Sequence, residues 1–305
     1  MSRFMVTGAS GLLGLNFALA VDGRQHQVTG VDNRNPLGWV NFATRQADLI
    51  ENGIIETLVE EIKPDVILHC AAMANVDDCE KRPQMAQRVN AELPGQIAAV
   101  AKKHQIKMVH ISTDAVFDGQ KGNYSESDVP APLSVYARTK REGELAVLAA
   151  NPSALVTRVN FYGWSISGTR SLAEFFVNNL ADGKEVKGFT DIHFCPMMVL
   201  DLAATLVEAV TKDLSGLYHT VGPESMSKYA FGVAIARQFG FDEGLVKPAS
   251  VSEGGLAAAR SPNLTLSTEK MAQALSHPLP GFAQGLVKFH DQYRHGFPQL
   301  IRSLA

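Results

Sequence analysis

The junction between the first apolar segment and the first helical segment constrains this chain more than any other part of its sequence. An apolar run at residues 4–6 leads into residues 7–14, Thr-Gly-Ala-Ser-Gly-Leu-Leu-Gly, after which apolar residues follow with helical spacing. Glycines at every third position let a strand turn tightly, let backbone approach a pyrophosphate, and let the helix pack on the strand. Free N–H groups at the helix start favour phosphate. The segment predicts a dinucleotide-binding turn, with contacts from Gly8, Ser10, Gly11, Leu12, Leu13 and Gly14.

An acidic residue stands where such a turn needs one. The next apolar segment, residues 27–31, ends in Asp32, which follows Gly14 by 18 positions. A carboxylate at the end of the second strand accepts hydrogen bonds from the adenosine ribose. It also repels a 2′-phosphate, so NAD(H) is favoured, while Arg34 could offset part of that repulsion and keeps NADP(H) possible. Asn33 is expected in the same contact.

Strand and helix signals then alternate along the chain. A helix is expected at residues 54–62, a strand at 66–70, and a helical region at 83–104 with a break at Pro94. This order predicts an α/β fold with a Rossmann-type doubly wound parallel sheet. Small residues after the strand at 66–70 would let a cofactor lie close to the backbone. Further cofactor contacts are expected at Asp48, Leu49, Cys70, Ala71, Ala72 and Met73, with Asn75 and Val76 on the substrate side.

A strand that ends in hydroxyls precedes a helix carrying Tyr and Lys one turn apart. Residues 108–111 lead to Ser112 and Thr113, and Tyr136 and Lys140 are i and i+4 neighbours in a helical pattern. A free Tyr has a pKa near ~10, and a nearby ammonium stabilises its phenolate. We therefore expect a catalytic titration well below that value. A strand-end hydroxyl can hold the same substrate oxygen, so Thr113, Tyr136 and Lys140 are the expected catalytic residues, with Ser112 beside them.

The composition argues against several classes of protein. The chain has 305 residues, 46% hydrophobic content and a net charge of −3, so it can bury a full core and gives no basic surface for nucleic acid. Its apolar runs are shorter than the ~18 residues that span a bilayer, and the first residues look like a strand rather than a leader. A cytoplasmic protein is expected. Three cysteines without paired spacing argue against a disulfide framework or a metal site.

The second half is expected to form a substrate-binding lobe. A strand at 154–159 is followed by an aromatic cluster at 160–164, where open α/β sheets bind ligands, although core packing is the alternative. Phe161 is a candidate substrate contact, and Arg260 lies in a loop where a guanidinium suits a nucleotide diphosphate. Asp201 is expected to cap a helix at 202–211, and a strand at 217–220 to return to the main sheet. The expected division is a dinucleotide-binding domain at 1–160, to which 190–220 returns, and a lobe at 161–189 and 221–305.

Several motifs together resemble a known family. They are the glycine turn, residues 112–119 (Ser-Thr-Asp-Ala-Val-Phe-Asp-Gly), Tyr124-x-Glu126-x-Asp128, Tyr136-x-x-x-Lys140-x-x-Gly143-Glu144 and, later, residues 216–219 and 260–270. This pattern is similar to the extended short-chain dehydrogenase/reductases and, within them, to the dTDP-4-dehydrorhamnose reductase family. The resemblance implies a catalytic trio of Thr113, Tyr136 and Lys140 that reduces a 4-keto nucleotide sugar with a nicotinamide cofactor. Asp114 would then contact the substrate.

Other functions stay open on the same motifs. An epimerase of this fold would reoxidise its cofactor within one turnover. A dehydratase would carry an acid pair after Thr113, and Ala115 follows Asp114 here, which argues against it. A non-catalytic subunit is the third alternative, because the methionine adenosyltransferase regulatory subunit also resembles this family. Departures from the family pattern at Ala115, Ala137, Phe161 and Ser261 suggest an altered sugar pocket. Expected partners are a nucleotide sugar and, as an open alternative, a second copy in a homodimer.

Overall fold

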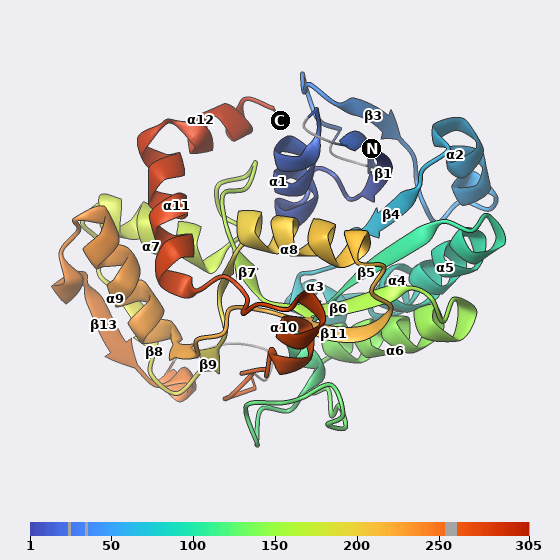
Figure 1. Ribbon diagram of the computed structural model, residues 1–305. Helices are drawn as coiled ribbons and strands as arrows, with labels where there is room; N and C mark the ends of the chain where they lie inside the picture. The colour runs from blue at the N-terminus through green and yellow to red at the C-terminus, as the bar shows by residue number, and fades with distance from the viewer. Residues whose placement is uncertain (24–25, 34–35, 254–260, 305) are drawn as a thin grey trace.

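A seven-stranded parallel sheet forms the centre of the molecule (Figure 1). The computed structural model describes residues 1–23, 26–33, 36–253 and 261–304. The strand order is β11-β6-β5-β4-β1-β2-β3. Their bounds are β1 (Ser2–Thr7), β2 (His26–Asp32), β3 (Ala43–Gln46), β4 (Val66–His69), β5 (Lys107–Thr113), β6 (Leu155–Val159) and β11 (Gly216–Thr220). The expected doubly wound sheet is confirmed, and so is the return of the strand near 217–220 to it.

Helices cover both faces of this sheet (Figure 1). Along β1, Phe4 and Val6 belong to one apolar cluster and Met5 to another, because successive side chains point to opposite faces. The first cluster includes residues of α1 (Leu12–Val21) and α8 (Val199–Thr211), and the second includes residues of α2 (Ile54–Ile62), α5 (Leu93–Lys103) and α6 (Val135–Ala150). The sheet is thus buried on both sides, as parallel sheets are.

The helical region expected at 83–104 is built from several pieces. It contains α4 (Pro83–Gln87), a π-helical segment Arg88–Glu92 and α5, and a further helix, α3 (Val76–Lys81), precedes it. Pro94 lies in the first turn of α5, directly after the π-helical segment. The irregularity is therefore the π-helical segment before Pro94. Helix α3 was not expected from the sequence; the Asn75 side chain caps it by accepting from the Asp78 N–H at 3.0 Å.

Smaller elements from the second half of the chain form a lobe beside the sheet (Figure 1). Three two-stranded sheets occur within the described residues, pairing β7 with β10, β9 with β12, and β8 with β13. The strands are β7 (Phe161–Tyr162), β8 (Val186–Phe189), β9 (His193–Phe194), β10 (Met197–Met198), β12 (Met226–Ser227) and β13 (Val246–Ala249). The lobe helices are α7 (Leu172–Ala181), α9 (Lys228–Phe239), α11 (Phe282–Arg294) and α12 (Phe297–Arg302), whereas α10 (Glu269–Leu275) lies against β11 of the main sheet.

The start of α8 differs from the expectation. Asp201 does not cap a helix at 202–211, because α8 begins at Val199 with Met198 as its N-cap residue. Asp201 lies instead in the first turn, buried, and pairs with the ammonium of Lys288 on α11. The carboxylate therefore joins α8 to the lobe.

Most of the aromatic cluster at 160–164 belongs to the core. Trp164 is buried and stacks on Phe289 with ring centroids 4.1 Å apart, and Tyr162 packs edge-on against the same ring. Phe161 alone of these three aromatic residues is only partly buried. The packing alternative is thus confirmed for Tyr162 and Trp164.

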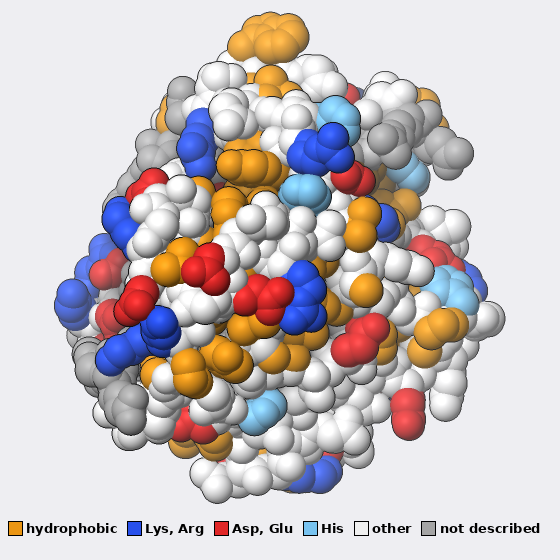
Figure 2. Space-filling model, turned by 90° about the vertical axis from the view of Figure 1, so that its left-hand side faces the viewer, with side chains coloured by type: hydrophobic (Ala, Val, Ile, Leu, Met, Phe, Trp, Pro, Cys, Tyr) orange, Lys and Arg blue, Asp and Glu red, His pale blue; other side chains and the backbone are white. Residues whose placement is uncertain are grey.

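The outer face of the lobe carries a mixed surface. Figure 2 shows apolar side chains lying among charges of both signs on this side of the molecule. Exposed apolar residues of the lobe helices include Phe175, Val287, Tyr293 and Leu300. Among the residues described, no helix is both long and apolar enough to cross a membrane.

Candidate active site

The glycine turn has room for backbone only. Gly8 adopts φ +68°, and a Cβ there would lie 2.8 Å from the backbone of Ala71 at the end of β4. A Cβ on Gly14 would lie 2.3 Å from the Gly8 carbonyl oxygen. The N-cap position of α1 is Gly11, which offers no side-chain cap to the first N–H groups of the helix. The turn therefore presents free N–H donors and an open backbone surface, which fit a pyrophosphate.

Asp32 lies at the carboxyl end of β2 with one carboxylate oxygen unused. Its Oδ1 accepts from the Ser10 N–H at 2.6 Å, while its Oδ2 is buried without a partner among the described residues. Desolvation raises the pKa of Asp32, and the Ser10 hydrogen bonds partly oppose that rise. A buried acceptor without a donor is rare, and ribose hydroxyls are donors of the right kind. Asn33 is exposed and its carbonyl accepts from Gln46, and Arg34 lies outside the described residues.

The segment after β4 runs beside the glycine turn. The Ala71 N–H donates to the Thr7 hydroxyl at 3.4 Å, and Cys70 is a thiol whose pKa burial raises to about 12, so it stays neutral. Both backbone groups of Met73 bond to the side chain of Asn90, at 2.9 and 3.0 Å. Ala72 remains exposed between these fixed points.

Two of the residues expected to contact the cofactor, Asp48 and Leu49, have other contacts. The Asp48 carboxylate accepts from the Ile50 N–H at 3.3 Å and its carbonyl accepts from Glu51, so Asp48 closes its own turn. Leu49 is buried in the apolar cluster beneath α2. These contacts are those of a turn that closes on itself over the apolar cluster.

Thr113 and Tyr136 meet at the carboxyl end of β5. Thr113 ends that strand, and Tyr136 lies in the first turn of α6, which Ser134 caps by accepting from the Ala137 N–H. The Thr113 hydroxyl lies beside the phenol. Burial raises the pKa of Tyr136 to about 12, and the Asp114 carboxylate adds to the rise. The phenol is therefore neutral at pH 7 and can donate its proton.

Lys140 lies close by but faces a different group. Its ammonium is buried and donates to the Ile111 carbonyl at 2.6 Å. Desolvation lowers the pKa of Lys140 to about 8, and the negative charge of Glu144 opposes that change. The expected lowering of the Tyr136 pKa by this ammonium is wrong for this arrangement, because burial of the phenol dominates.

Ser112 also differs from the expectation. Because successive side chains alternate along β5, its hydroxyl lies on the α6 face and donates to Glu144 at 2.6 Å, away from Thr113. Ser112 therefore supports the helix that carries Tyr136 and does not share a substrate oxygen with Thr113.

Asp114 is the charged group closest in sequence to the hydroxyl pair. Its Oδ1 accepts from the Thr113 hydroxyl at 3.1 Å and its Oδ2 accepts from the Asn160 amide at 2.6 Å. Burial raises the pKa of Asp114 to about 6. Asn160 was missed as a site residue; its signal was a polar residue directly after a buried strand, hidden by the aromatic residues that follow.

The remaining substrate candidates are spread around this edge. Asn75 is exposed and Val76 begins α3, and Phe161 lies partly buried in β7 beyond the end of β6. Arg260 lies outside the described residues.

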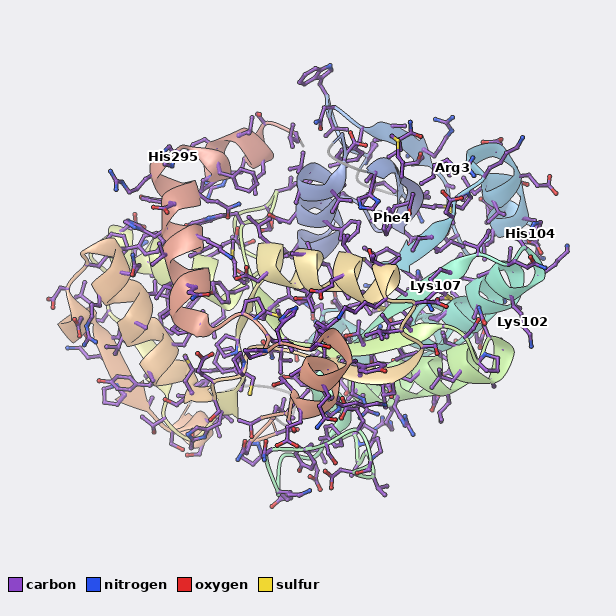
Figure 3. The ribbon with its side chains drawn as sticks, in the orientation of Figure 1. Arg3, Phe4, Lys102, His104, Lys107 and His295 are labelled. Atoms are coloured by element: carbon purple, nitrogen blue, oxygen red, sulfur yellow. The ribbon has the colours of Figure 1, made fainter. Side chains whose placement is uncertain are left out.

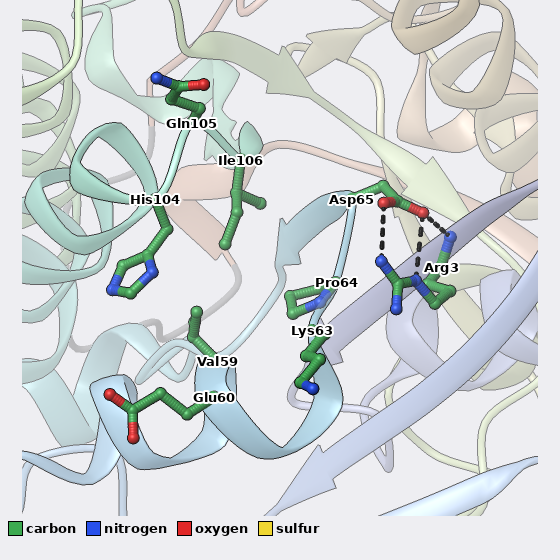
Figure 4. Close-up of a pocket in the computed structure, with 9 residues that line it drawn as sticks. All are labelled: Arg3, Val59, Glu60, Lys63, Pro64, Asp65, His104, Gln105 and Ile106. Atoms are coloured by element: carbon green, nitrogen blue, oxygen red, sulfur yellow. Dashed lines mark hydrogen bonds and ion pairs between the residues drawn. The ribbon is translucent and has the colours of Figure 1, made fainter.

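A hollow of about 580 Å³ lies at the opposite edge of the sheet (Figure 4). It is lined by residues near the starts of β1, β4 and β5, among them Arg3, Asp65 and Ile106. Figure 3 shows Lys102, His104 and Lys107 on this side, at the end of α5 and the start of β5. Since Thr113 ends β5, the hollow is separated from the candidate site by the length of the strand.

Comparison with known proteins gives the family. The model of the RmlD substrate binding domain matches residues 2–295. The chain belongs to this family.

The relatives of this RmlD-family chain have different names. It is 34% identical to the probable low-salt glycan biosynthesis reductase of Haloferax volcanii, over 84% of this chain and 86% of that one. It is 29% identical to the dTDP-4-dehydrorhamnose reductase of Aggregatibacter actinomycetemcomitans, over 90% and 93%. It is also 31% identical to methionine adenosyltransferase 2 subunit beta of Pongo abelii, over 88% and 81%.

A solved structure of the family shares the fold. The dTDP-4-dehydrorhamnose reductase of Bacillus anthracis, in complex with NADP, superposes with a TM-score of 0.84 at 25% identity, covering 95% of this chain and 99% of that one. The fold of this RmlD-family chain is therefore that of a nicotinamide-binding relative.

Proposed function

We propose that this protein is an NAD(P)H-dependent reductase of a nucleotide-linked 4-keto-6-deoxy sugar. The observation that carries the proposal is that Thr113 and Tyr136 lie side by side at the carboxyl end of β5, on the edge of the sheet where the glycine turn and Asp32 also lie. Open α/β sheets bind ligands at that edge. The relatives that are named reductases support the same reaction class.

The chain's own residues have distinct tasks in this reaction. The Tyr136 hydroxyl, neutral at pH 7, donates its proton to the carbonyl oxygen of the sugar. The Thr113 hydroxyl holds that oxygen, and Lys140 holds the ribose next to the reactive ring of the cofactor. A bound nicotinamide cofactor supplies the hydride.

Cofactor and substrate are assigned to separate parts of the chain in this proposal. Residues 1–160, with 190–220, bind the cofactor, and Asp32 favours NAD(H) over NADP(H). Residues 161–189 and 221–305 form the substrate lobe. Asn75, Val76, Asp114, Phe161 and Arg260 are the proposed contacts to the sugar nucleotide.

A second candidate is a non-catalytic subunit of another enzyme. The observation that favours it is the 31% identity to methionine adenosyltransferase 2 subunit beta over most of both chains. An epimerase is the third candidate, because the same trio would serve a reaction that returns the hydride.

A panel of 4-keto nucleotide sugars separates the three. Each sugar is mixed with the protein and NADH or NADPH, and the nicotinamide absorbance is followed. A reductase oxidises the cofactor in proportion to product. Isomerisation without net oxidation indicates an epimerase, and silence across the panel, with cofactor binding retained, indicates the non-catalytic subunit.

A further inference from the structure

A fully buried carboxylate lies one helical turn beyond Lys140. Glu144 on α6 accepts through Oε1 from the Ser112 hydroxyl at 2.6 Å and from Arg158 Nε at 2.8 Å. Its Oε2 accepts from Arg158 Nη2 at 2.8 Å and from Arg141 Nη1 at 2.7 Å. A buried carboxylate is costly unless it is paired and hydrogen-bonded, and both oxygens here meet that condition twice over.

Arg158, the main partner of Glu144, is itself held by contacts with two other side chains. It is buried on β6, its Nη1 lies 3.3 Å from Nε2 of His219 on β11, and its guanidinium carbon lies 4.9 Å from the centroid of the Phe117 ring. A bidentate pair in which one member is held this way sets both distance and direction. Arg158 therefore fixes the position of the Glu144 carboxylate.

These bonds fasten one helix to two strands. Through Ser112 the carboxylate is joined to β5 at the residue directly before Thr113, and through Arg158 it is joined to β6. Both Tyr136 and Lys140 are on the helix that is held, and Thr113 is on the strand that holds it. The relative placement of the three depends on this junction.

We propose that Glu144 is a positioning residue for the candidate catalytic trio: it fastens the helix of Tyr136 and Lys140 to the strand of Thr113 and places a buried carboxylate one helical turn beyond Lys140. The consequence for turnover rests on the proposed reductase function. The effect on Lys140 itself does not.

Among the described residues, Glu144 is the carboxylate whose charge favours the ammonium form of Lys140. Desolvation favours the neutral amine, and the Glu144 carboxylate is the first opposing influence, ahead of the Cys70 thiol. The pKa values of both neighbouring imidazoles, His69 on β4 and His110 on β5, are lowered by burial and then by the Lys140 charge, so they stay neutral at pH 7. The titratable or charged groups around Lys140 and its carboxylate thus include Tyr136, one turn earlier on α6, and Glu144, Cys70, His69, His110, Arg141 and Arg158.

The test measures the ionisation of Lys140 directly. Protein carrying ¹³C at the lysine Cε is titrated by NMR, and the Lys140 signal is assigned by its loss in Lys140→Met. In Glu144→Gln the midpoint should fall by at least about one pH unit, as expected when a close opposite charge is removed. Because Lys140 is proposed to hold the cofactor ribose, NADH affinity should fall at high pH as Lys140 loses its proton. In Glu144→Gln this fall in affinity should occur at a lower pH, together with the Lys140 midpoint. A folded Glu144→Gln protein with an unchanged midpoint overturns the proposal.

A surface variant keeps the proposal testable if Glu144→Gln does not fold. Arg141 contacts Glu144 from the exposed side, its own side chain being 26% exposed, so Arg141→Met should leave the fold intact. Without the Arg141 guanidinium, the negative charge of Glu144 is less compensated and stabilises the Lys140 ammonium more strongly. The Lys140 midpoint should therefore rise by roughly half a pH unit. Arg138→Met is the matched control: it removes an exposed arginine of α6 that is not among the donors to Glu144. Equal shifts in the two variants overturn the proposal.

A second control tests whether the Lys140 midpoint responds to Glu144 in particular or to the loss of any buried carboxylate. Glu174 is also fully buried but caps α7 through Ser165, Arg170 and Ser171 N–H groups, with no bond to Lys140's helix. Glu174→Gln should destabilise the fold and leave the Lys140 midpoint unchanged. If wild type reduces no sugar in the panel, the reductase proposal fails while the midpoints still decide the role of Glu144. If wild type is active and Glu144→Gln keeps its midpoint, only the role of Glu144 fails.

Discussion

Tyr136 is neutral at physiological pH, and this defines its expected role as a proton donor. Burial raises the pKa of the phenol to about 12, and the Thr113 hydroxyl lies beside it. Tyr136→Phe removes one hydroxyl and almost no volume. Turnover on a substrate of the enzyme should fall by at least ~100-fold, while NADH affinity stays nearly unchanged. Stopped-flow oxidation of NADH and a fluorescence titration measure the two quantities.

Lys140→Met is the contrasting variant for that experiment. Because Lys140 is proposed to hold the cofactor ribose, its loss should weaken NADH binding together with turnover. Near-wild-type turnover in Tyr136→Phe would place the proton donor elsewhere.

Asp32 has one oxygen left for a cofactor. Its Oδ1 is taken by the Ser10 N–H and its Oδ2 is buried without a described partner. Asp32→Ala should therefore weaken NADH by about 1–3 kcal/mol, the value of a hydrogen bond to a charged group, and weaken NADPH much less. Isothermal titration with each cofactor measures the difference. Equal losses for both would show that the carboxylate does not contact the ribose.

Asp114 should make stability depend on pH in an unusual direction. Burial raises its folded pKa to about 6, above the ordinary value of 3.8. Such a group favours the fold below its unfolded pKa, and that contribution is lost as pH rises through about 6. Asp114→Asn should remove this loss, so that the variant gains up to about 3 kcal/mol relative to wild type between pH 4 and pH 8. Urea unfolding at the two pH values gives the comparison.

Asp118 supplies the control of opposite sign. The Tyr124 hydroxyl donates to it at 2.6 Å and lowers its pKa. Its contribution is present above the unfolded pKa and lost as pH falls through the folded one. Asp118→Asn should therefore lose stability at pH 8 relative to pH 4. A pH trend of the same sign in both variants would contradict the account of Asp114.

Single residues were predictable from the sequence where a local pattern fixed them. Asp32 follows a strand and a glycine turn, and Tyr136 and Lys140 share a helix face. Their spacing in the sequence was enough to predict them as site residues. The pairing of Glu144 with Arg158 was not predictable, because the two residues are 14 positions apart on different elements and meet only when α6 packs on β6. The spacing of Tyr136 and Lys140 also did not indicate that burial of the phenol would raise the Tyr136 pKa.

At the scale of the element, the first turn of the fold depends on the absence of side chains. Gly8 and Gly240 adopt nearly the same left-handed backbone, with φ of +68° and +71°. A Cβ on Gly8 meets the Ala71 backbone, whereas nothing lies within 4 Å of one on Gly240. Gly240→Ala should cost about 1 kcal/mol from the backbone alone. Gly8→Ala should cost about 1–3 kcal/mol more, because β4 must move, and it should also weaken NADH.

Urea unfolding and NADH titration of these two variants provide the check. If both variants lost the same free energy of unfolding, the segment after β4 would move aside at no cost in stability. The close approach of Ala71 to Gly8 would then not contribute to stability.

Elements were predictable when their signals were local. The expected helix at 54–62 coincides with α2, and the capping box at Ser171 and Glu174 opens α7. Pairings between distant segments were not predictable. The Tyr124 N–H donates to the Thr265 carbonyl at 2.9 Å, and the Ser267 N–H donates back to Tyr124 at 2.7 Å, so a segment near the end of the chain fixes the loop after β5.

For the whole molecule, the main apolar cluster continues from the sheet into the lobe. It contains Phe4 of β1 and Leu13 of α1 together with Phe231 of α9, Phe289 of α11 and Leu304 near the end of the chain. Neither part can lose its side of this cluster without exposing the other. Cofactor and substrate lobes should therefore unfold together, although their proposed tasks differ.

Calorimetry tests this coupling with the cofactor as the probe. We expect one transition, and NADH at 100 times its dissociation constant should stabilise the protein by about 2.7 kcal/mol, moving that transition as a unit. The NADH-dependent shift should shrink in Asp32→Ala, which would still show one transition because it leaves the apolar cluster untouched. Two transitions, of which NADH moves only one, would mean that the lobe folds independently of the sheet despite the shared cluster. The junction at Glu144 would then lie within the part that NADH stabilises, because α6, β5 and β6 all belong to the sheet and its covering helices.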